Sequence, residues 1–128
     1  MIIRVLDEKR ANICDMLLTK LIQDERKYNS FINEKFIVND YFKNVIQNKD
    51  NILLCYEEEE NILGYIYLKL IKDEDKNGYL IDGLYVERNY RNKGIASKLI
   101  DSSLSIIKDK NINFIDINVM ANNKAAIN

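Results

Sequence analysis

The spacing of apolar residues changes several times along the chain, and each change marks the start of a predicted element. A short apolar run at residues 2–6 predicts a first strand. Residues 9–22 then repeat apolar positions with a helical period. A second helical pattern covers residues 31–47, with Phe31 as its first apolar position. The first third of the chain therefore predicts one strand followed by two helices.

The middle of the chain changes to a β pattern. Residues 51–57, 62–71 and 79–86 are rich in β-forming residues, and polar turns separate them. Such runs predict three antiparallel strands joined as hairpins. Residues 94–108 return to a helical period, and residues 113–119 predict a last strand. Because a helix separates this strand from the preceding one, we expect the two strands to be parallel.

The order of these elements predicts one α/β (α+β) domain over residues 1–128. Its sheet should be mixed, mostly antiparallel and flanked by helices. Beyond the last strand, Asn122 or Asn123 has the character of a helix N-cap. Only the opening turn of that helix would fit before residue 128.

Composition and charge exclude several classes of function. The formal net charge is -1, so the chain lacks the basic excess that binds nucleic acid or an anionic membrane surface. The N-terminus has charged residues where a signal peptide needs an apolar run, and no run approaches the roughly 18 apolar residues that cross a bilayer. We therefore expect a cytoplasmic protein with neither nucleic acid nor membrane as partner. Cys14 and Cys55 are expected to be reduced core thiols.

Histidine is absent from the sequence. This excludes a Ser-His-Asp triad, a Cys-His nucleophile pair and a histidine metal site, and we expect no bound metal. Any chemistry must use carboxylates, tyrosines, lysines, backbone amides or a bound cofactor.

A strand, a polar turn and a glycine-containing helix start follow one another at residues 82–99. The first amides of a helix have no internal partner and, with the helix dipole, form an anion site. Gly94 lets a phosphate approach the backbone closely, Ala96 is expected to keep the next exposed position small, and Ser97 adds a hydroxyl donor. Arg91 and Lys93 place positive charge beside the same amides. The segment fits a pyrophosphate, although it matches neither a Walker loop nor a dinucleotide fingerprint.

Here the sequence resembles the GCN5-related N-acetyltransferase (GNAT) family. The run Arg91-Asn92-Lys93-Gly94-Ile95-Ala96 is similar to the family's Gln/Arg-x-x-Gly-x-Gly/Ala signature, and residues 123–127 are similar to its Asn-x-x-Ala-Ile run. The resemblance implies a GNAT-like acyl-CoA N-acyltransferase fold with acetyl-CoA as co-substrate. It also implies that the strand at residues 84–86 splays from residues 113–119 to open a cleft for the thioester.

In this family the signature amides hold the pyrophosphate, the preceding strand pairs with the pantetheine arm, and the later asparagine reaches toward that arm. The residues that the resemblance assigns to acetyl-CoA are Leu84, Tyr85, Val86, Arg91, Asn92, Lys93, Gly94, Ile95, Ala96, Ser97 and Asn123. Asn123 also has a second interpretation as a plain helix cap.

The resemblance implies direct attack of a primary amine, on a small molecule or a protein, on the thioester. A strand amide near Val86 would stabilise the oxyanion by about 3 kcal/mol. Asp82 is the candidate base, directly or through water; the alternatives are a solvent-facing carboxylate or a contact to a cationic substrate.

The chain is C-terminally short relative to the family, whose members usually continue with a thiolate-protonating tyrosine and two more strands. Tyr28, Tyr41, Tyr85 and Tyr90 are present, but their spacing singles out none as a substitute acid. A non-catalytic acyl-CoA-binding or interaction module is therefore the alternative to an active enzyme. A homodimer is one way to cover the open sheet edge.

Overall fold

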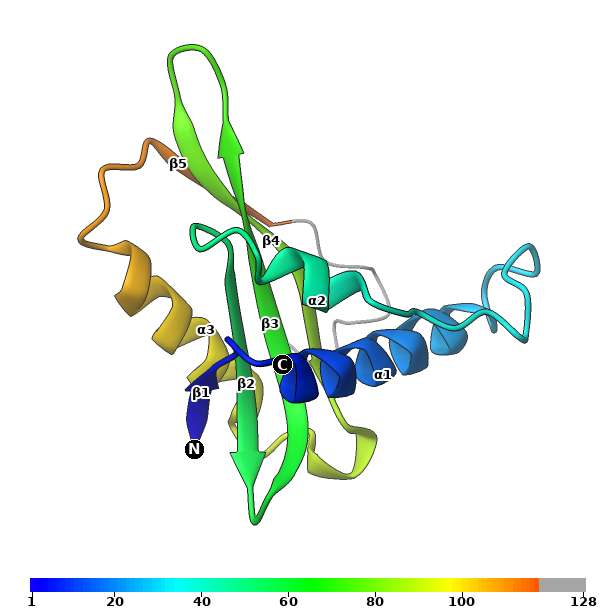
Figure 1. Cartoon of the computed structure of the whole chain (residues 1–128). Helices are drawn as coiled ribbons and strands as arrows, with labels where there is room; N and C mark the ends of the chain where they lie inside the picture. The colour runs from blue at the N-terminus through cyan, green and yellow to red at the C-terminus, as the bar shows by residue number, and fades with distance from the viewer. Residues whose placement is uncertain (118–128) are drawn as a thin grey trace.

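The computed structural model describes residues 1–117, which form one five-stranded sheet with helices on both faces (Figure 1). The elements are β1 (Ile2–Arg4), α1 (Glu8–Glu25), α2 (Tyr41–Val45), β2 (Ile52–Glu58), β3 (Asn61–Lys72), β4 (Asn77–Val86), the short 3-10 helix η1 (Arg88–Tyr90), α3 (Ile95–Ile107) and β5 (Phe114–Ile117). The strand order is β1-β2-β3-β4-β5. Strands β1 to β4 are antiparallel, and β5 pairs with β4 in parallel, so the predicted mixed sheet is confirmed.

Two separate cores lie on the two faces of this sheet. Helices α1 and α2 cover one face, where Leu53 and Cys55 of β2 contact them. Helix α3 covers the other face, where Ile52 and Leu54 of the same strand point. Because side chains alternate along a strand, a strand that is buried on both faces becomes a continuous apolar run. Cys14 is buried in the first core with Cys55, and neither forms a disulfide.

The second predicted helix is wrong for most of its length. Residues 31–40 are turns and coil, and α2 keeps only Tyr41–Val45. Asp40 has a left-handed φ of 57°, which interrupts a helix. Asn29 and Asn33 accept hydrogen bonds from backbone N–H groups two residues later, at 3.1 and 2.8 Å. Such Asx turns compete with helix formation, and the apolar spacing does not reveal them.

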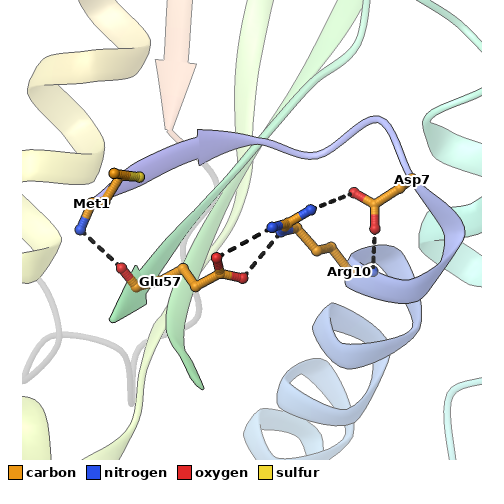
Figure 2. A network of polar contacts seen from close by, with 4 residues as sticks. All are labelled: Met1, Asp7, Arg10 and Glu57. Atoms are coloured by element: carbon orange, nitrogen blue, oxygen red, sulfur yellow. Dashed lines mark hydrogen bonds and ion pairs between the residues drawn. The ribbon is translucent and has the colours of Figure 1, made fainter. Parts of the chain in front are cut away.

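A polar network fixes the start of α1 against the end of β2 (Figure 2). Asp7 caps α1 by accepting from the N–H of Arg10 at 3.0 Å. The Arg10 guanidinium also pairs with the carboxylates of Asp7 at 3.2 Å and Glu57 at 3.1 Å. The Met1 ammonium donates to the Glu57 carbonyl at 2.9 Å. The network therefore holds β1, α1 and β2 together at the sheet edge away from β4.

The hairpin of β3 and β4 projects beyond the rest of the sheet at the top of Figure 1, and α3 then returns the chain to β5. Over residues 1–117, no helix is long and apolar enough to cross a membrane.

Candidate active site

The turn between β4 and α3 contains two left-handed residues close together. Asn92 has φ of 63°, and Gly94, the N-cap of α3, has φ of 83°. Asparagine and glycine are the residues that adopt this region at least cost. The backbone N–H groups of residues 92–97 make no hydrogen bond to any other residue of the described part. The turn therefore presents a row of free donors at a helix N-terminus, the arrangement that binds anions.

The space above these amides is open. A Cβ built onto Gly94 would meet no heavy atom within 4 Å. Ser97 is exposed beside it, so its hydroxyl is available. The expectation that Ala96 occupies an exposed position is wrong, because its side chain is only 7% exposed and packs in the core beneath α3 with Ile95. The small residue at this position thus serves the packing of α3 on the sheet.

The two cations of the turn lie against aromatic rings. Arg91 donates from Nε to the Val86 carbonyl at 2.8 Å, and its guanidinium carbon lies 5.4 Å from the Tyr85 ring centroid. Lys93 Nζ lies 5.4 Å from the Tyr90 ring centroid. Contacts of this kind are attractive because the ring face carries negative partial charge. Arg91 therefore fastens the turn to the end of β4, while Lys93 is exposed beside the free amides.

The C-terminal half of β4 has one edge that no described strand covers. The Glu87 N–H donates to Leu63 of β3 at 2.8 Å. Backbone groups of alternate residues point to opposite edges in an antiparallel ladder, so Tyr85 faces β3 and Leu84 and Val86 face away from it. Strand β5 pairs with β4 only between Gly78 and Ile81. The uncovered edge therefore offers the N–H and C=O of Leu84 and the N–H of Val86, whose carbonyl already accepts from Arg91.

Two of the sequence expectations fall on residues outside the described part. Asn123 belongs to residues 118–128, as do the last two residues of the predicted strand 113–119. The role of Asn123 and the splaying of the strands thus stay predictions.

Asp82 is the extra residue of a β-bulge. The register pairs Tyr67 with Gly83 and Leu68 with Ile81, so no residue of β3 stands opposite Asp82. Bulges re-aim side chains and occur often beside active sites. On either side of this bulge, Ile81 and Leu84 lie in the α3 core, and Asp82 and Gly83 between them therefore both lie on the face that α1 and α2 cover.

Asp82 lies among aromatic side chains on that face. The Tyr41 ring packs edge-to-face against Phe42 at 5.0 Å and Tyr67 at 6.3 Å. Burial raises the pKa of Tyr41, and the nearby charge of Asp82 raises it further. Burial likewise raises the pKa of Tyr65 and Tyr67, again with a smaller contribution from Asp82. Asp82 forms no ion pair with any residue of 1–117, so its half-buried carboxylate has no cationic partner there.

Sequence reasoning missed the association of Tyr41 and Tyr67 with Asp82. One signal for it was present in the apolar pattern of β4. Tyr79 and Ile81 are followed by Leu84 and Val86, so the apolar phase shifts by one residue between them. A shift of that kind indicates a bulge at residues 82–83.

Two further features complete the surroundings of the site. A cavity of about 450 Å³ lies between the C-terminal half of α1 and the end of β4, where Lys20 pairs with Glu87 at 2.9 Å. Within the described residues, no three His, Cys, Asp or Glu side chains are placed to hold a metal ion.

Comparisons with known proteins agree with the resemblance in the sequence. The model of the Acetyltransferase (GNAT) family matches residues 16–128. The N-alpha-acetyltransferase daf-31 of Caenorhabditis elegans is 26% identical over 98 residues, which are 74% of this chain and 53% of that protein. The chain thus spans about half the length of this curated relative.

Solved structures share the fold at low sequence identity. An acetyltransferase from Vibrio fischeri superposes with a TM-score of 0.74 and 19% identity, covering 93% of this chain and 95% of that one. A variant of the BH1408 protein of Bacillus halodurans gives a TM-score of 0.80 at 19% identity, covering 97% of this chain and 85% of that one. The predicted family resemblance and fold are confirmed.

Proposed function

The chain belongs to the GNAT acetyltransferase family, and from that premise we propose that it transfers an acetyl group from acetyl-CoA to a primary amine by direct attack. The observation that carries the proposal is the row of amides at residues 92–97, which make no hydrogen bond to other residues of the described part and lie beneath open space at Gly94. This row continues into the uncovered edge of β4. An anion site joined to a free strand edge suits a ligand that has a pyrophosphate at one end and an amide-containing arm.

The residues present fit such a donor. The amides of residues 92–97 would hold the pyrophosphate, with the Ser97 hydroxyl and the Lys93 ammonium beside them. The N–H and C=O of Leu84 and the N–H of Val86 would pair with the amides of the arm. Arg91 would act indirectly, because its contact with the Val86 carbonyl holds the turn in register with the strand. Acetyl-CoA, when bound, supplies an activated acetyl group.

The amine has to lose a proton as it attacks, and Asp82 is the carboxylate placed to receive it. Asp82 lies two residues before Leu84, on the sheet face that carries Tyr41 and Tyr67. A positioned base contributes typically 10²–10⁴-fold to a rate. An oxyanion forming at the edge of β4 would be stabilised by a strand N–H, which is worth about 3 kcal/mol when well placed.

The acceptor is a small-molecule or protein amine. The matched relative is named as an N-alpha-acetyltransferase, so we would test the free α-amine of a peptide first. Asp82 has no ion-pair partner among residues 1–117, and its negative charge supports an acceptor that arrives as an ammonium ion.

The first test is thermal unfolding of the chain with acetyl-CoA, with adenosine as control. A ligand at a hundred times its Kd stabilises the native state by about 2.7 kcal/mol. We expect a clear rise in Tm with acetyl-CoA and none with adenosine. Absence of a rise would overturn the donor site.

The second test is release of free CoA in the presence of a panel of small amines and peptides, followed by mass spectrometry of the acceptor. A mass increase of one acetyl group on an amine is the expected result. Binding of acetyl-CoA without transfer to any amine would favour the non-catalytic acyl-CoA-binding module.

A further inference from the structure

The leaving thiolate of the proposed reaction needs a proton, and the eight tyrosines of the sequence are candidate donors. Four of them lie on the sheet face that α1 and α2 cover. Tyr65, Tyr67 and Tyr85 are at most 4% exposed, whereas Tyr41 is 39% exposed. Within residues 1–117, Tyr41 is therefore the exposed tyrosine of this face.

We propose that Tyr41 is the catalytic residue that donates a proton to the leaving thiolate, and that it works as a unit with Asp82. This inference rests on the function proposed above and extends it to the second half of the proton transfer.

The placement of the two groups supports the pairing. The anion site lies beyond the C-terminal end of β4, so a donor that runs back along Val86 and Leu84 points its thioester toward Asp82. At about 3.3 Å per residue, Asp82 lies about 7 Å before Leu84 along the strand. Tyr41 reaches the same place from α2, where its hydroxyl feels the charge of the Asp82 carboxylate. Acid and base thus meet at the end of the proposed donor track.

The Tyr41 side chain is held by its surroundings. Its backbone belongs to the first turn of α2, where the buried Asp15 carboxylate of α1 accepts from the Phe42 N–H at 3.0 Å. Its ring packs against Phe42 and Tyr67, in edge-to-face contacts that favour a fixed orientation. Phe42 in turn packs against Tyr65 at 5.2 Å. A helix of only five residues is therefore held by a backbone hydrogen bond, and its Tyr41 by ring contacts.

For a neutral amine, the proton balance closes within this pair. The amine nitrogen forms a bond to the acetyl carbon as the carbon–sulfur bond breaks, and sulfur leaves with the electron pair. The amine releases one proton to Asp82, and Tyr41 gives one proton to sulfur. Asp82 then returns its proton to the Tyr41 oxygen, so both groups end as they began. An acceptor that arrives as an ammonium ion releases its additional proton to water before it attacks.

The electrostatic surroundings keep the phenol protonated until it is needed. The titratable groups that face Tyr41 are Asp15 of α1, Asp82 of β4, and Tyr65 and Tyr67 of β3. Burial, and then the negative charges of Asp82 and Asp15, raise the pKa of Tyr41. A proton donor must be protonated at neutral pH; a phenol of ordinary pKa, about 10, already is, and the upward shift keeps Tyr41 in that state.

The test compares Tyr41→Phe, Asp82→Asn and the double variant with the wild type, with Tyr28→Phe as a matched control. Tyr28 is 80% exposed on the loop after α1. We expect each single variant to lower kcat about 100-fold or more. Because groups that act as a unit are non-additive, the double variant should lose no more than the worse single variant. The control should keep the wild-type kcat.

A second readout needs no turnover. Tyrosine ionisation is followed by ultraviolet absorbance in the free protein, and the Tyr41 signal is obtained by subtracting the Tyr41→Phe titration. Asp82→Asn should shift that signal to lower pH, because a negative charge beside the phenol has been removed. The rise in Tm with acetyl-CoA should be unchanged in Tyr41→Phe.

The outcomes separate this inference from the proposed function. Wild-type turnover with an unchanged kcat in Tyr41→Phe overturns the role of Tyr41 alone. Losses that multiply in the double variant overturn the unit, as does a Tyr41 titration that ignores Asp82→Asn. A wild type that neither binds acetyl-CoA nor releases CoA overturns the proposed function and this inference with it.

Discussion

Two buried tyrosines of this protein should respond to the same substitution with opposite changes in stability. The Tyr65 hydroxyl is completely buried and has no hydrogen-bond partner among the described residues. The Tyr79 hydroxyl, on the other face of the sheet, donates to the Asp50 carbonyl at 2.9 Å in a residue only 2% exposed. Each change to Phe removes one oxygen from a packed core. The difference between the two changes in the free energy of unfolding therefore measures the contribution of the hydrogen bond.

The expected magnitudes follow from the state of each hydroxyl. A buried polar group without a partner costs about 1–3 kcal/mol, and Tyr65→Phe removes that cost. The small void left by one oxygen offsets part of the gain, so we expect Tyr65→Phe to stabilise the protein by about 1 kcal/mol. Tyr79→Phe loses a satisfied bond and leaves the Asp50 carbonyl without this donor, so it should destabilise the protein by about 1 kcal/mol.

The assay is equilibrium urea unfolding, in which the two midpoints should move in opposite directions at an unchanged m value. For a chain of this length, about 1 kcal/mol corresponds to roughly 4 °C in Tm. If Tyr65→Phe were instead destabilised as much as Tyr79→Phe, the Tyr65 hydroxyl would have a partner, either a buried water or a residue beyond 117. That result would refute the reasoning.

Three further changes test other parts of the structure. Gly94→Ala should cost about 1–2 kcal/mol in urea unfolding, because an alanine at φ of 83° is strained, and its methyl group should reduce the Tm rise with acetyl-CoA. Burial raises the pKa of Asp15 above its ordinary value of 3.8, so the folded state binds this proton more tightly than the unfolded chain does. The protein should therefore lose stability as the pH rises from 3.8 through that raised pKa. Urea midpoints compared across pH should show this loss in the wild type and not in Asp15→Asn. Arg10→Met removes the ion pairs to Asp7 and Glu57, and its effect on the urea midpoint should shrink as salt is added.

Local signals explain why most of the fold can be predicted from the sequence. The strands β2, β3 and β4 are recognisable as apolar runs between polar turns, and α3 has a clear apolar stripe. Residues 31–47 mislead because Phe31 resembles the start of a helical face. In the structure Phe31 is 96% exposed, and α2 begins ten residues later. There the Asp15 carboxylate accepts a hydrogen bond from the Phe42 N–H. A partner 27 residues away cannot be read from periodicity.

The glycine turn can be predicted for the same reason that the strands can. Its free amides follow from a strand, a turn and a helix start that are contiguous in sequence. The pairing of Tyr41 with Asp82 cannot be predicted from the sequence, because it joins residues of α2 and β4 across the sheet face. Arg91 is an intermediate case: its charge is evident in the sequence, but its use in binding the Val86 carbonyl depends on the path of the turn.

The bulge at Asp82 links these features, because one inserted residue has two effects on the side chains of β4. In a regular strand, Tyr79 and Ile81 would share a face with Gly83 and Tyr85, which would put Leu84 and Val86 with Asp82 on the opposite face. The extra residue moves Leu84 and Val86 back into the α3 core. It leaves Asp82 on the face that α1 and α2 cover, without a strand partner. Gly83 follows on the same face, and a Cβ there would lie 3.3 Å from the Tyr65 hydroxyl. The bulge that leaves Asp82 without a strand partner thus also places a residue without a side chain beside the Tyr65 hydroxyl, which has no hydrogen-bond partner within residues 1–117. The two features therefore have one structural cause.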